Sequence, residues 1–356
     1  MYFKQFLHDS TGCSSYFIAS RDSREAAVVD PQIDIQPYAE LAADRGYRIT
    51  HVIDTHLHAD HLSGNRALAS ATGAELCLHE SAAAVFPFTA LRDSSEVNIG
   101  QLILRVMHTP GHRPEALSLV VINPPRSDSP SMALSGDTLF VGDVGRPDFG
   151  GREGAIEQYR STRRLLELED WVEVFPAHFE GSCGKRMCGR PSSTIGFERR
   201  FNPMLQLSMD EFVEMAAEVP PRPLNMTSIL EANRGALQYR WPTAYARDSV
   251  STITVSDAAS WLEQNDGAII DVREPAEFAR GHVPRAMSLP QADLSSRLQD
   301  VPARPLLVVC ETGRRSLGAA AFLVATGFQA VSLDGGTRGW VDAGLPVAAD
   351  PVGQTR

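Results

Sequence analysis

The chain has 356 residues, of which 43% are hydrophobic and 22% charged, as in an ordinary globular protein with room for two domains. Its formal net charge of −11 argues against the basic surface that binds nucleic acid or an anionic membrane. There is no membrane-spanning apolar run and no signal-peptide pattern, and five cysteines indicate free thiols in the cytoplasm rather than a disulfide framework.

The first half of the chain predicts strands and helices in close succession. Apolar runs bounded by turn residues predict strands over 3–7, 15–19, 26–30, 49–53, 76–79, 97–99, 102–106, 132–134 and 172–175. Helical spacing predicts helices over 37–45, 64–73 and 209–218. Strand-rich stretches with helices between them are typical of a layered αββα sandwich.

The densest group of polar side chains follows the strand over 49–53. Three imidazoles and one carboxylate fall within six residues, at His56, His58, Asp60 and His61. In an extended segment residues i and i+2 point the same way, so His56 and His58 are expected to face one point, with Asp60 and His61 at the start of a helix. First-row metals share these ligands, which favours a metal site over a strand end whose histidines only form hydrogen bonds.

This HxHxDH pattern resembles the signature of the metallo-β-lactamase superfamily. The resemblance implies further ligands downstream, and the chain supplies candidates at His112, Asp137 and His178. Each of them follows an apolar run, so each is expected on a loop at a strand end. Ligands on loops held by a rigid sheet are a common design of a functional site.

Two loops near these candidates carry charged side chains. A glycine-rich loop over 142–151 contains Arg146 and Asp148, and a cationic segment over 181–196 contains Lys185 and Arg186. They are interpreted as groups that bind a substrate carboxylate or position the loop that does, the alternatives being a surface turn and a structural connection. The sequences GRPDFGG and CGK…PSSTIGFERRFNP resemble the persulfide dioxygenase branch of the superfamily, over residues 1 to about 240.

After a proline-rich segment over 219–225 and a linker over 240–249, a second α/β pattern begins. Strands are predicted over 252–255, 268–272, 306–309 and 330–333. Helices are predicted over 258–263, after a cap at Ser256-Asp257, and over 275–279 and 315–326. This alternation predicts a parallel sheet with helices on both faces. We therefore expect two α/β domains, over residues 1–245 and 246–356.

Cys310 ends the strand over 306–309 and precedes a helix. At this place a thiolate would be favoured by the helix dipole and by free backbone N–H groups. The short loop that follows could hold an anion among its amides, the alternative being a buried structural cysteine. The loop residues are Glu311, Thr312, Gly313, Arg314 and Arg315.

The second half resembles a rhodanese domain over about residues 250–350. The resemblance rests on Asp271-Val272-Arg273-Glu274, Glu277-Phe278, Gly281-His282-Val283, the CETGRRS loop, Gly335-Gly336 and Gly339-Trp340. Rhodanese-like domains carry a sulfane sulfur on a cysteine as a persulfide. The resemblance therefore implies that Cys310 is the catalytic sulfur carrier.

Together the two resemblances imply a persulfide dioxygenase fused to a sulfurtransferase. The implied cofactor is one Fe(II) per chain, bound by His56, His112 and Asp137 as a facial triad with open positions. His58, Asp60, His61 and His178 would orient these ligands or bind a second metal. The implied reaction oxidises a thiol persulfide, glutathione persulfide above all, with O₂ to sulfite and thiol, while Cys310 exchanges sulfur with sulfite or thiosulfate. The resemblance does not specify whether the chain forms a homo-oligomer.

Two alternatives remain at this stage. One is a glyoxalase II-like thioester hydrolase with two metals, since all its ligands are present. The GRPDFGG loop, the CGK segment and the fusion argue against it. The other is a non-catalytic sulfur carrier or persulfide sensor, which the complete ligand set and the intact Cys310 loop disfavour. Turnover of O₂ would separate a dioxygenase from both.

Overall fold

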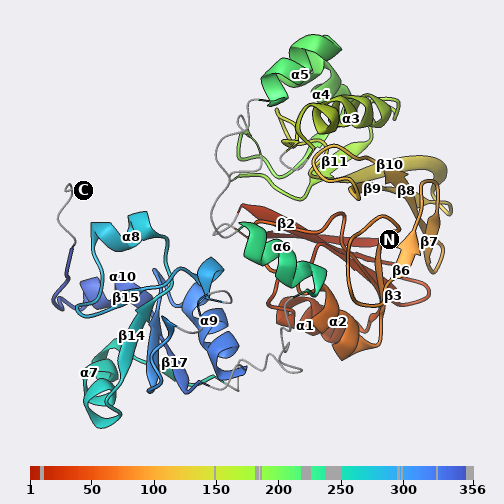
Figure 1. Cartoon of the computed structure of the whole chain (residues 1–356). Coiled ribbons are helices and arrows are strands. Elements are labelled where there is room, and N and C mark those ends of the chain that lie inside the picture. The colour runs from red at the N-terminus through yellow and green to blue at the C-terminus, as the bar shows by residue number, and fades with distance from the viewer. Residues whose placement is uncertain are drawn as a thin grey trace. The chain divides into compact units, whose positions relative to one another are not determined.

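The computed structural model describes residues 1–8, 12–147, 150–180, 184, 187–217, 226–236, 250–294, 297, 300–325 and 328–349. The chain divides into two compact units, Met1–Leu237 and Gln238–Arg356 (Figure 1). The domain boundary predicted between residues 245 and 246 lies outside the described residues, as do the predicted linker and the proline-rich segment. Among the described helices, none is both long enough and apolar enough to cross a membrane.

The first unit begins with a six-stranded sheet whose strands follow the order of the chain. Its strands are β1 (Tyr2–His8), β2 (Cys13–Ala19), β3 (Glu25–Val29), β4 (Arg48–Ile53), β5 (Glu75–His79) and β6 (Thr89–Leu91). The first three pair antiparallel, and β3 to β6 pair parallel. The parallel connection from β3 to β4 contains α1 (Gln36–Arg45), and that from β4 to β5 contains α2 (Asn65–Thr72). Every residue of β2 is buried, as expected of a strand covered on both faces.

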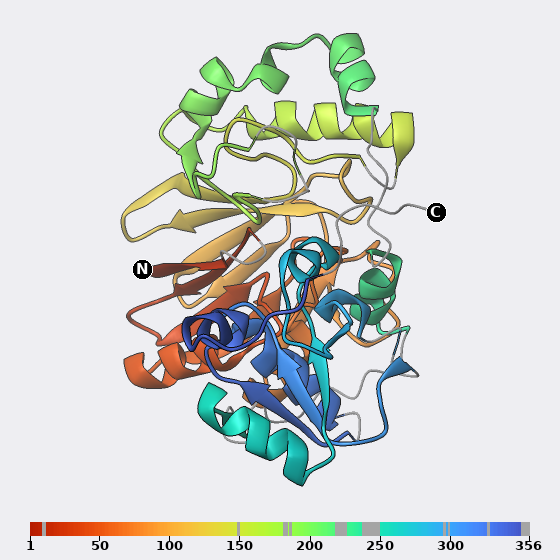
Figure 2. The ribbon, with the colours of Figure 1, turned by 90° about the vertical axis from the view of Figure 1, so that its left-hand side faces the viewer.

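A second six-stranded sheet has the order β12-β11-β10-β9-β8-β7. Its strands are β7 (Glu96–Ile99), β8 (Leu102–His108), β9 (Leu117–Asn123), β10 (Ser127–Gly136), β11 (Glu173–Pro176) and β12 (Ser193–Thr194). Only β10 and β11 pair parallel, and the crossover between them is α3 (Gly151–Leu165). Figures 1 and 2 show α3 on the outer face of this sheet, together with α4 (Ile195–Phe201) and α5 (Met209–Ala217). The unit also contains η1 (Pro203–Gln206) and α6 (Met226–Arg234).

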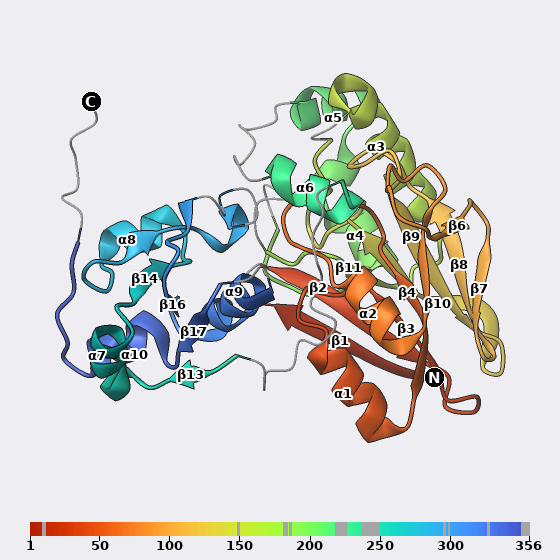
Figure 3. The same cartoon turned by 60° about the horizontal axis from the view of Figure 1, so that its bottom comes forward.

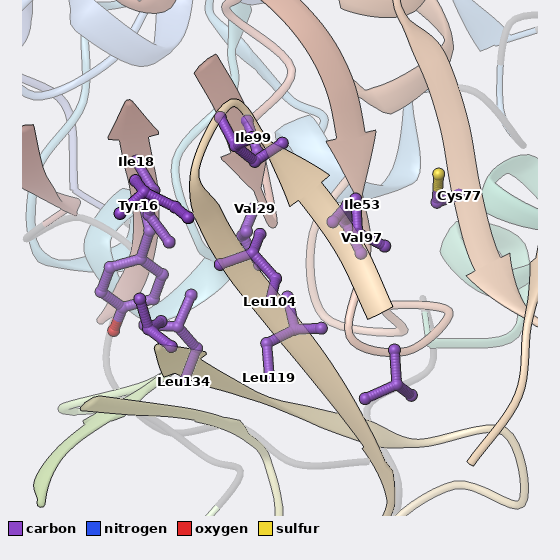
Figure 4. Close-up of a cluster of buried hydrophobic side chains, with 14 of the residues drawn as sticks. Tyr16, Ile18, Val29, Ile53, Cys77, Val97, Ile99, Leu104, Leu119 and Leu134 are labelled. Carbon is purple, nitrogen blue, oxygen red and sulfur yellow. The ribbon is translucent and has the colours of Figure 1, made fainter. Parts of the chain in front are cut away.

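The core of the first unit lies between its two sheets. Tyr16, Ile18 and Val29 of the first sheet meet Leu104 and Leu119 of the second in one buried apolar cluster (Figure 4). In Figure 3, α1 and α2 lie on the opposite side of the first sheet from the second sheet. The predicted αββα sandwich is therefore confirmed.

The second unit is built on a parallel sheet, as predicted, and the sheet has a fifth strand over Met287–Ser288 that was not predicted. In spatial order the strands are β13 (Thr252–Ile253), β17 (Ala330–Leu333), β16 (Leu306–Val309), β14 (Ala268–Asp271) and β15 (Met287–Ser288). The helical segments are α7 (Val255–Gln264), α8 (Pro275–Arg280), η3 (Gln291–Asp293), α9 (Arg314–Ala325) and α10 (Gly336–Asp342). The predicted cap of α7 at Ser256-Asp257 is wrong, because the Thr254 hydroxyl accepts the N–H of Asp257 and the helix begins at Val255.

Candidate functional site

The candidate metal ligands lie on loops that follow strands of both sheets. His56 follows β4 of the first sheet, whereas His112, Asp137 and His178 follow β8, β10 and β11 of the second. The turn before Asp137 depends on Gly136, which has a positive φ of 54° and whose added Cβ would lie 2.9 Å from the Thr55 hydroxyl. The packing of the two sheets thus gathers segments that are far apart in the sequence.

His56, His112 and Asp137 form one buried group. Asp137 Oδ2 lies 3.5 Å from His112 Nε2 and 3.9 Å from His56 Nε2. His112 Nδ1 donates to the carbonyl of Arg146 at 2.7 Å, which leaves Nε2 directed at the carboxylate. Within the described part of the chain, His56 Nε2 and Asp137 Oδ2 are buried with no hydrogen-bond partner. Buried polar atoms rarely lack a partner, so this donor set fits a metal ion.

Electrostatics keep two of these groups in the form that binds metal. Burial raises the pKa of Asp137, but the interactions of its carboxylate with the neighbouring imidazoles, above all the hydrogen-bonded contact with His178, outweigh burial and hold the pKa well below its usual range. Burial lowers the pKa of His56 well below its usual value, and repulsion from His58 adds to this. Asp137 is therefore ionised and His56 neutral near pH 7, as metal ligands must be.

A second group contains Cys13, His61 and His178, which are buried, and Asp60, which is partly exposed. His178 Nε2 lies 2.7 Å from Asp60 Oδ2, and its Nδ1 lies 2.7 Å from Asp137 Oδ1, which links the two groups. Cys13 Sγ lies 3.3 Å from His178 Nε2. Burial raises the pKa of Cys13, but His178 and His61 outweigh it and lower the pKa to about 7. Sequence reasoning missed Cys13, because a lone cysteine 43 residues before His56 has no motif to connect it to the site.

His58 belongs to a third group, with Asp30 and Asp54. Its Nε2 lies 3.1 Å from Asp30 Oδ1, which also accepts the N–H of Thr55 at 2.7 Å. The rings of His56 and His58 are neighbours, with centroids 4.2 Å apart, although the segment that carries them is not a strand. The structure therefore places His58 in a different group of ligand atoms from Asp60, His61 and His178, which the sequence placed in one set, although the ring centroids of His58 and His61 lie 4.3 Å apart.

The helix predicted over 64–73 is confirmed as α2, but Asp60 and His61, which were expected at its start, precede it. Both residues lie in a bend, and α2 begins only at Asn65. Asn233 of α6 holds this bend in place, since its side-chain N–H₂ donates to the carbonyls of His58 and His61 at 2.8 Å. These backbone carbonyls are thus satisfied by a side chain from a distant helix, which competes with helix formation.

The predicted substrate-binding residues are only partly described. Arg146 is buried beside the first group and contacts it through its carbonyl oxygen. Its role in binding a carboxylate stays a prediction. Asp148, Lys185 and Arg186 lie outside the described residues.

Cys310 lies at the carboxyl end of β16, directly before the loop that leads into α9. Its sulfur is buried and accepts the N–H of Gly313 at 3.2 Å. Arg315 forms a bidentate ion pair with Glu277, with N–O distances of 2.7 and 2.6 Å. Glu311 lies 3.2 Å from Arg273 and 3.5 Å from Arg338. The loop therefore places a backbone donor on the sulfur, and ion pairs fix the side chains of Glu311 and Arg315.

Comparison with known proteins agrees with this architecture. Family models of the metallo-beta-lactamase superfamily and of the rhodanese-like domain match residues 9–178 and 254–343. The mitochondrial persulfide dioxygenase ETHE1 of Homo sapiens is 30% identical over 243 residues, which cover 64% of this chain and 85% of the human protein.

Solved structures extend the similarity to the fold. The crystal structure of ETHE1 from Myxococcus xanthus has a TM-score of 0.59 at 30% identity, covering 66% of this chain and 99% of that one. A metallo-beta-lactamase from Staphylococcus aureus has a TM-score of 0.70 at 25% identity and covers 94% of this chain and 99% of its own. The expected metallo-β-lactamase fold followed by a rhodanese domain is thereby confirmed.

Proposed function

Because this chain belongs to the persulfide dioxygenase family and carries a rhodanese-like domain, we propose that it oxidises a thiol persulfide with O₂ and also transfers sulfane sulfur. The thiol that we propose is glutathione. In the oxidation the outer sulfur receives two oxygen atoms from O₂ and one from water, and the products are sulfite, the free thiol and two protons. The substrates are then small molecules.

The observation that carries this proposal is the group His56, His112 and Asp137. Two imidazoles and one carboxylate are the donor set of mononuclear Fe(II) oxygenases. Among the described residues, the buried atoms His56 Nε2 and Asp137 Oδ2 have no hydrogen-bond partner. A ferrous ion held there would supply the redox chemistry that O₂ requires, which zinc lacks. We propose one such ion per chain.

Neighbouring side chains would position these three ligands. His178 Nδ1 fixes one oxygen of Asp137 and leaves the other to the ion. The carbonyl of Arg146 fixes the ring of His112 in the same way. Hydrogen bonds of this kind set the tautomer and the orientation of a ligand. We assign this positioning role also to His58, Asp60 and His61. We propose that Arg146, Asp148, Lys185 and Arg186 bind the carboxylates of the thiol or position the loop that binds them.

For the second unit we propose that Cys310 carries sulfane sulfur. Its thiolate takes the outer sulfur of a persulfide, which releases the thiol and leaves a persulfide on Cys310. Transfer of that sulfur to sulfite gives thiosulfate and restores the thiolate. The Gly313 N–H at 3.2 Å from the sulfur supports the proposal, because it stabilises negative charge there. The other loop residues, Glu311, Thr312, Arg314 and Arg315, would shape the same anion site.

The oxidation is tested by the stoichiometry of its products. Protein loaded anaerobically with Fe(II) is mixed with glutathione persulfide in air-saturated buffer, and sulfite, glutathione and O₂ are measured together. We expect one sulfite and one glutathione for each O₂ consumed. Sulfite release without O₂ uptake, or O₂ uptake that does not depend on persulfide, would refute the proposal.

A further inference from the structure

Cys13 is fixed beside the metal ligands by the backbone rather than by its own side chain. The N–H of Ser14 donates to the carbonyl of Ala177 at 2.6 Å, and the N–H of Phe179 donates to the carbonyl of Gly12 at 2.9 Å. This bridge joins the start of β2 to the segment that follows β11, and it pairs Cys13 with His178. The sulfur is fully buried, so it cannot turn away into solvent.

The sulfur closes a compact network of four side chains. Cys13 Sγ lies 3.3 Å from His178 Nε2, 3.4 Å from Asp60 Oδ2 and 3.7 Å from His61 Nδ1. Asp60 Oδ2 also lies 2.7 Å from His178 Nε2 and 3.1 Å from His61 Nδ1. Each atom that faces the centre of this group therefore has a partner within the group.

The first group of ligands is different in this respect. Within the residues that the structure describes, its unpartnered atoms face one another, whereas the unpartnered Nε2 of His61 in the second group is not one of the atoms in contact within the network. Among the described residues, His56 Nε2 and Asp137 Oδ2 are buried without a hydrogen-bond partner. Buried polar atoms without a partner are costly, and a bound ion would remove that cost. In the second group the atoms that face the centre are already hydrogen-bonded to one another. An ion would have to displace the protons of these hydrogen bonds.

One distance shows that the second group is contracted. Two ligands bound to the same tetrahedral zinc at about 2.0–2.2 Å lie roughly 3.3–3.5 Å apart. Asp60 Oδ2 and His178 Nε2 are only 2.7 Å apart, which is the separation of a direct hydrogen bond. These two side chains bind each other and leave no space for an ion between them.

We propose that Cys13 closes the position of a second metal, so that the centre of this protein holds a single ion. The inference rests on the proposed mononuclear function, and it names the residue that distinguishes this centre from one with two ions. The sulfur holds Asp60, His61 and His178 in a hydrogen-bonded network. Nε2 of His61 is buried without a hydrogen-bond partner in the described part of the chain, so the group retains a donor for an ion once the network opens.

The test counts metal ions rather than turnover. Full-length protein without metal is dialysed anaerobically against excess Co²⁺, desalted and analysed for metal content, and its absorption spectrum is recorded. Wild-type protein should retain one Co²⁺ per chain and show no thiolate-to-cobalt charge-transfer band from Cys13. Cys13→Ala should retain two. The double variant Cys13→Ala/Asp60→Ala should return to one, because it lacks the carboxylate that the second ion needs.

Cys77→Ala is the matched control, since it removes a buried thiol from the core cluster of the same unit and should retain one Co²⁺. Two Co²⁺ per wild-type chain with a charge-transfer band that Cys13→Ala abolishes would overturn the proposal, because Cys13 would then be a ligand. One Co²⁺ in a folded Cys13→Ala variant would overturn it as well. If the Cys13→Ala variant does not fold, the metal content and the absorption spectrum of the wild-type protein still test the proposal. Absence of persulfide-dependent O₂ uptake in a wild-type protein that binds one ion would instead count against the proposed function alone.

Discussion

At the scale of single residues, Asp137 is the point on which the metal centre depends. One of its oxygens is held by His178 at 2.7 Å, and the other faces His56 and His112. Its position also depends on a glycine, because a Cβ added to Gly145 would lie 1.7 Å from the Asp137 carbonyl oxygen. Backbone, unlike a flexible side chain, cannot yield to such a contact at low cost.

We therefore expect Gly145→Ala to displace Asp137 and to weaken metal binding. Overpacking of this kind costs about 1–3 kcal/mol of unfolding free energy. The measurement is metal content after dialysis, together with thermal unfolding of the metal-free protein. Gly318→Ala is the control, because the nearest atom to its added Cβ is 3.7 Å away, and it should retain its metal. A Gly145→Ala variant with full metal content and unchanged stability would contradict this expectation, because the loop would then accommodate the added methyl group without displacing Asp137.

Cys310 allows the two proposed activities to be separated. Cys310→Ser removes the proposed sulfur acceptor and leaves the residues of the metal centre unchanged. We expect transfer of sulfur from thiosulfate to cyanide to be lost, and persulfide-dependent O₂ uptake to be kept. Cys188→Ser, which changes an exposed thiol, is the comparison and should keep sulfur transfer. Full sulfur transfer by Cys310→Ser would mean that another cysteine carries the sulfur.

At the scale of elements, the start of α8 and the start of α9 are joined by the pair of Glu277 and Arg315. The hydrogen bonds from Arg315 lower the pKa of Glu277 to about 2. A carboxyl whose pKa is lowered by folding stabilises the protein above its unfolded pKa, about 4.3, and this contribution is lost as the pH falls toward 2. The pair thus fixes the Cys310 loop at neutral pH and weakens in acid.

Glu277→Gln removes this charge and should lower the melting temperature of the second unit at pH 7, by an amount that corresponds to about 1 kcal/mol or less. At pH 3 the difference between variant and wild type should be smaller, since the unfolded chain then binds a proton at Glu277. Thermal unfolding followed by circular dichroism at both pH values measures this difference. A difference in melting temperature that stays constant or increases at pH 3 would contradict the lowered pKa of Glu277.

The sequence predicted most elements because their apolar runs are long and well bounded. The strand over 306–309 matches β16 residue for residue, and the helix over 37–45 ends at Gly46, which has a positive φ of 66°. The helix α3 was not predicted, because four of its six buried positions, Gly154, Gln158, Ser161 and Thr162, are not apolar and leave no hydrophobic stripe in the sequence. The bend at Asp60 and His61 was missed because it depends on Asn233, which is more than 170 residues away.

The same limit applies to the candidate site. Residue types and strand ends were sufficient to predict which segments carry His56, His112 and Asp137, and the structure brings these three together. Their role as ligands stays a proposal. The presence of Cys13 could not be predicted, because it depends on how β2 meets the segment after β11. The separate group of His58 could not be predicted either, because it depends on its contacts with Asp30 and Asp54. Contacts between distant strands leave no pattern in a single sequence.

At the scale of the whole molecule, the chain combines a metallo-β-lactamase fold with a rhodanese-like domain. We propose that both units handle sulfane sulfur, and covalent linkage then raises the effective concentration of each site for the product of the other. A thioester hydrolase would have no use for this combination. The decisive property is therefore the chemistry of the metal in the first unit.

The most direct test compares the iron-loaded and the zinc-loaded protein on two substrates. An oxygen electrode follows O₂ uptake with glutathione persulfide, and absorbance follows hydrolysis of S-lactoylglutathione. We expect the iron form to consume O₂ only when persulfide is added, the zinc form to be inert toward persulfide, and Asp137→Ala to abolish the uptake. Hydrolysis of the thioester by the zinc form, together with no O₂ uptake by the iron form, would contradict the account and identify a hydrolase.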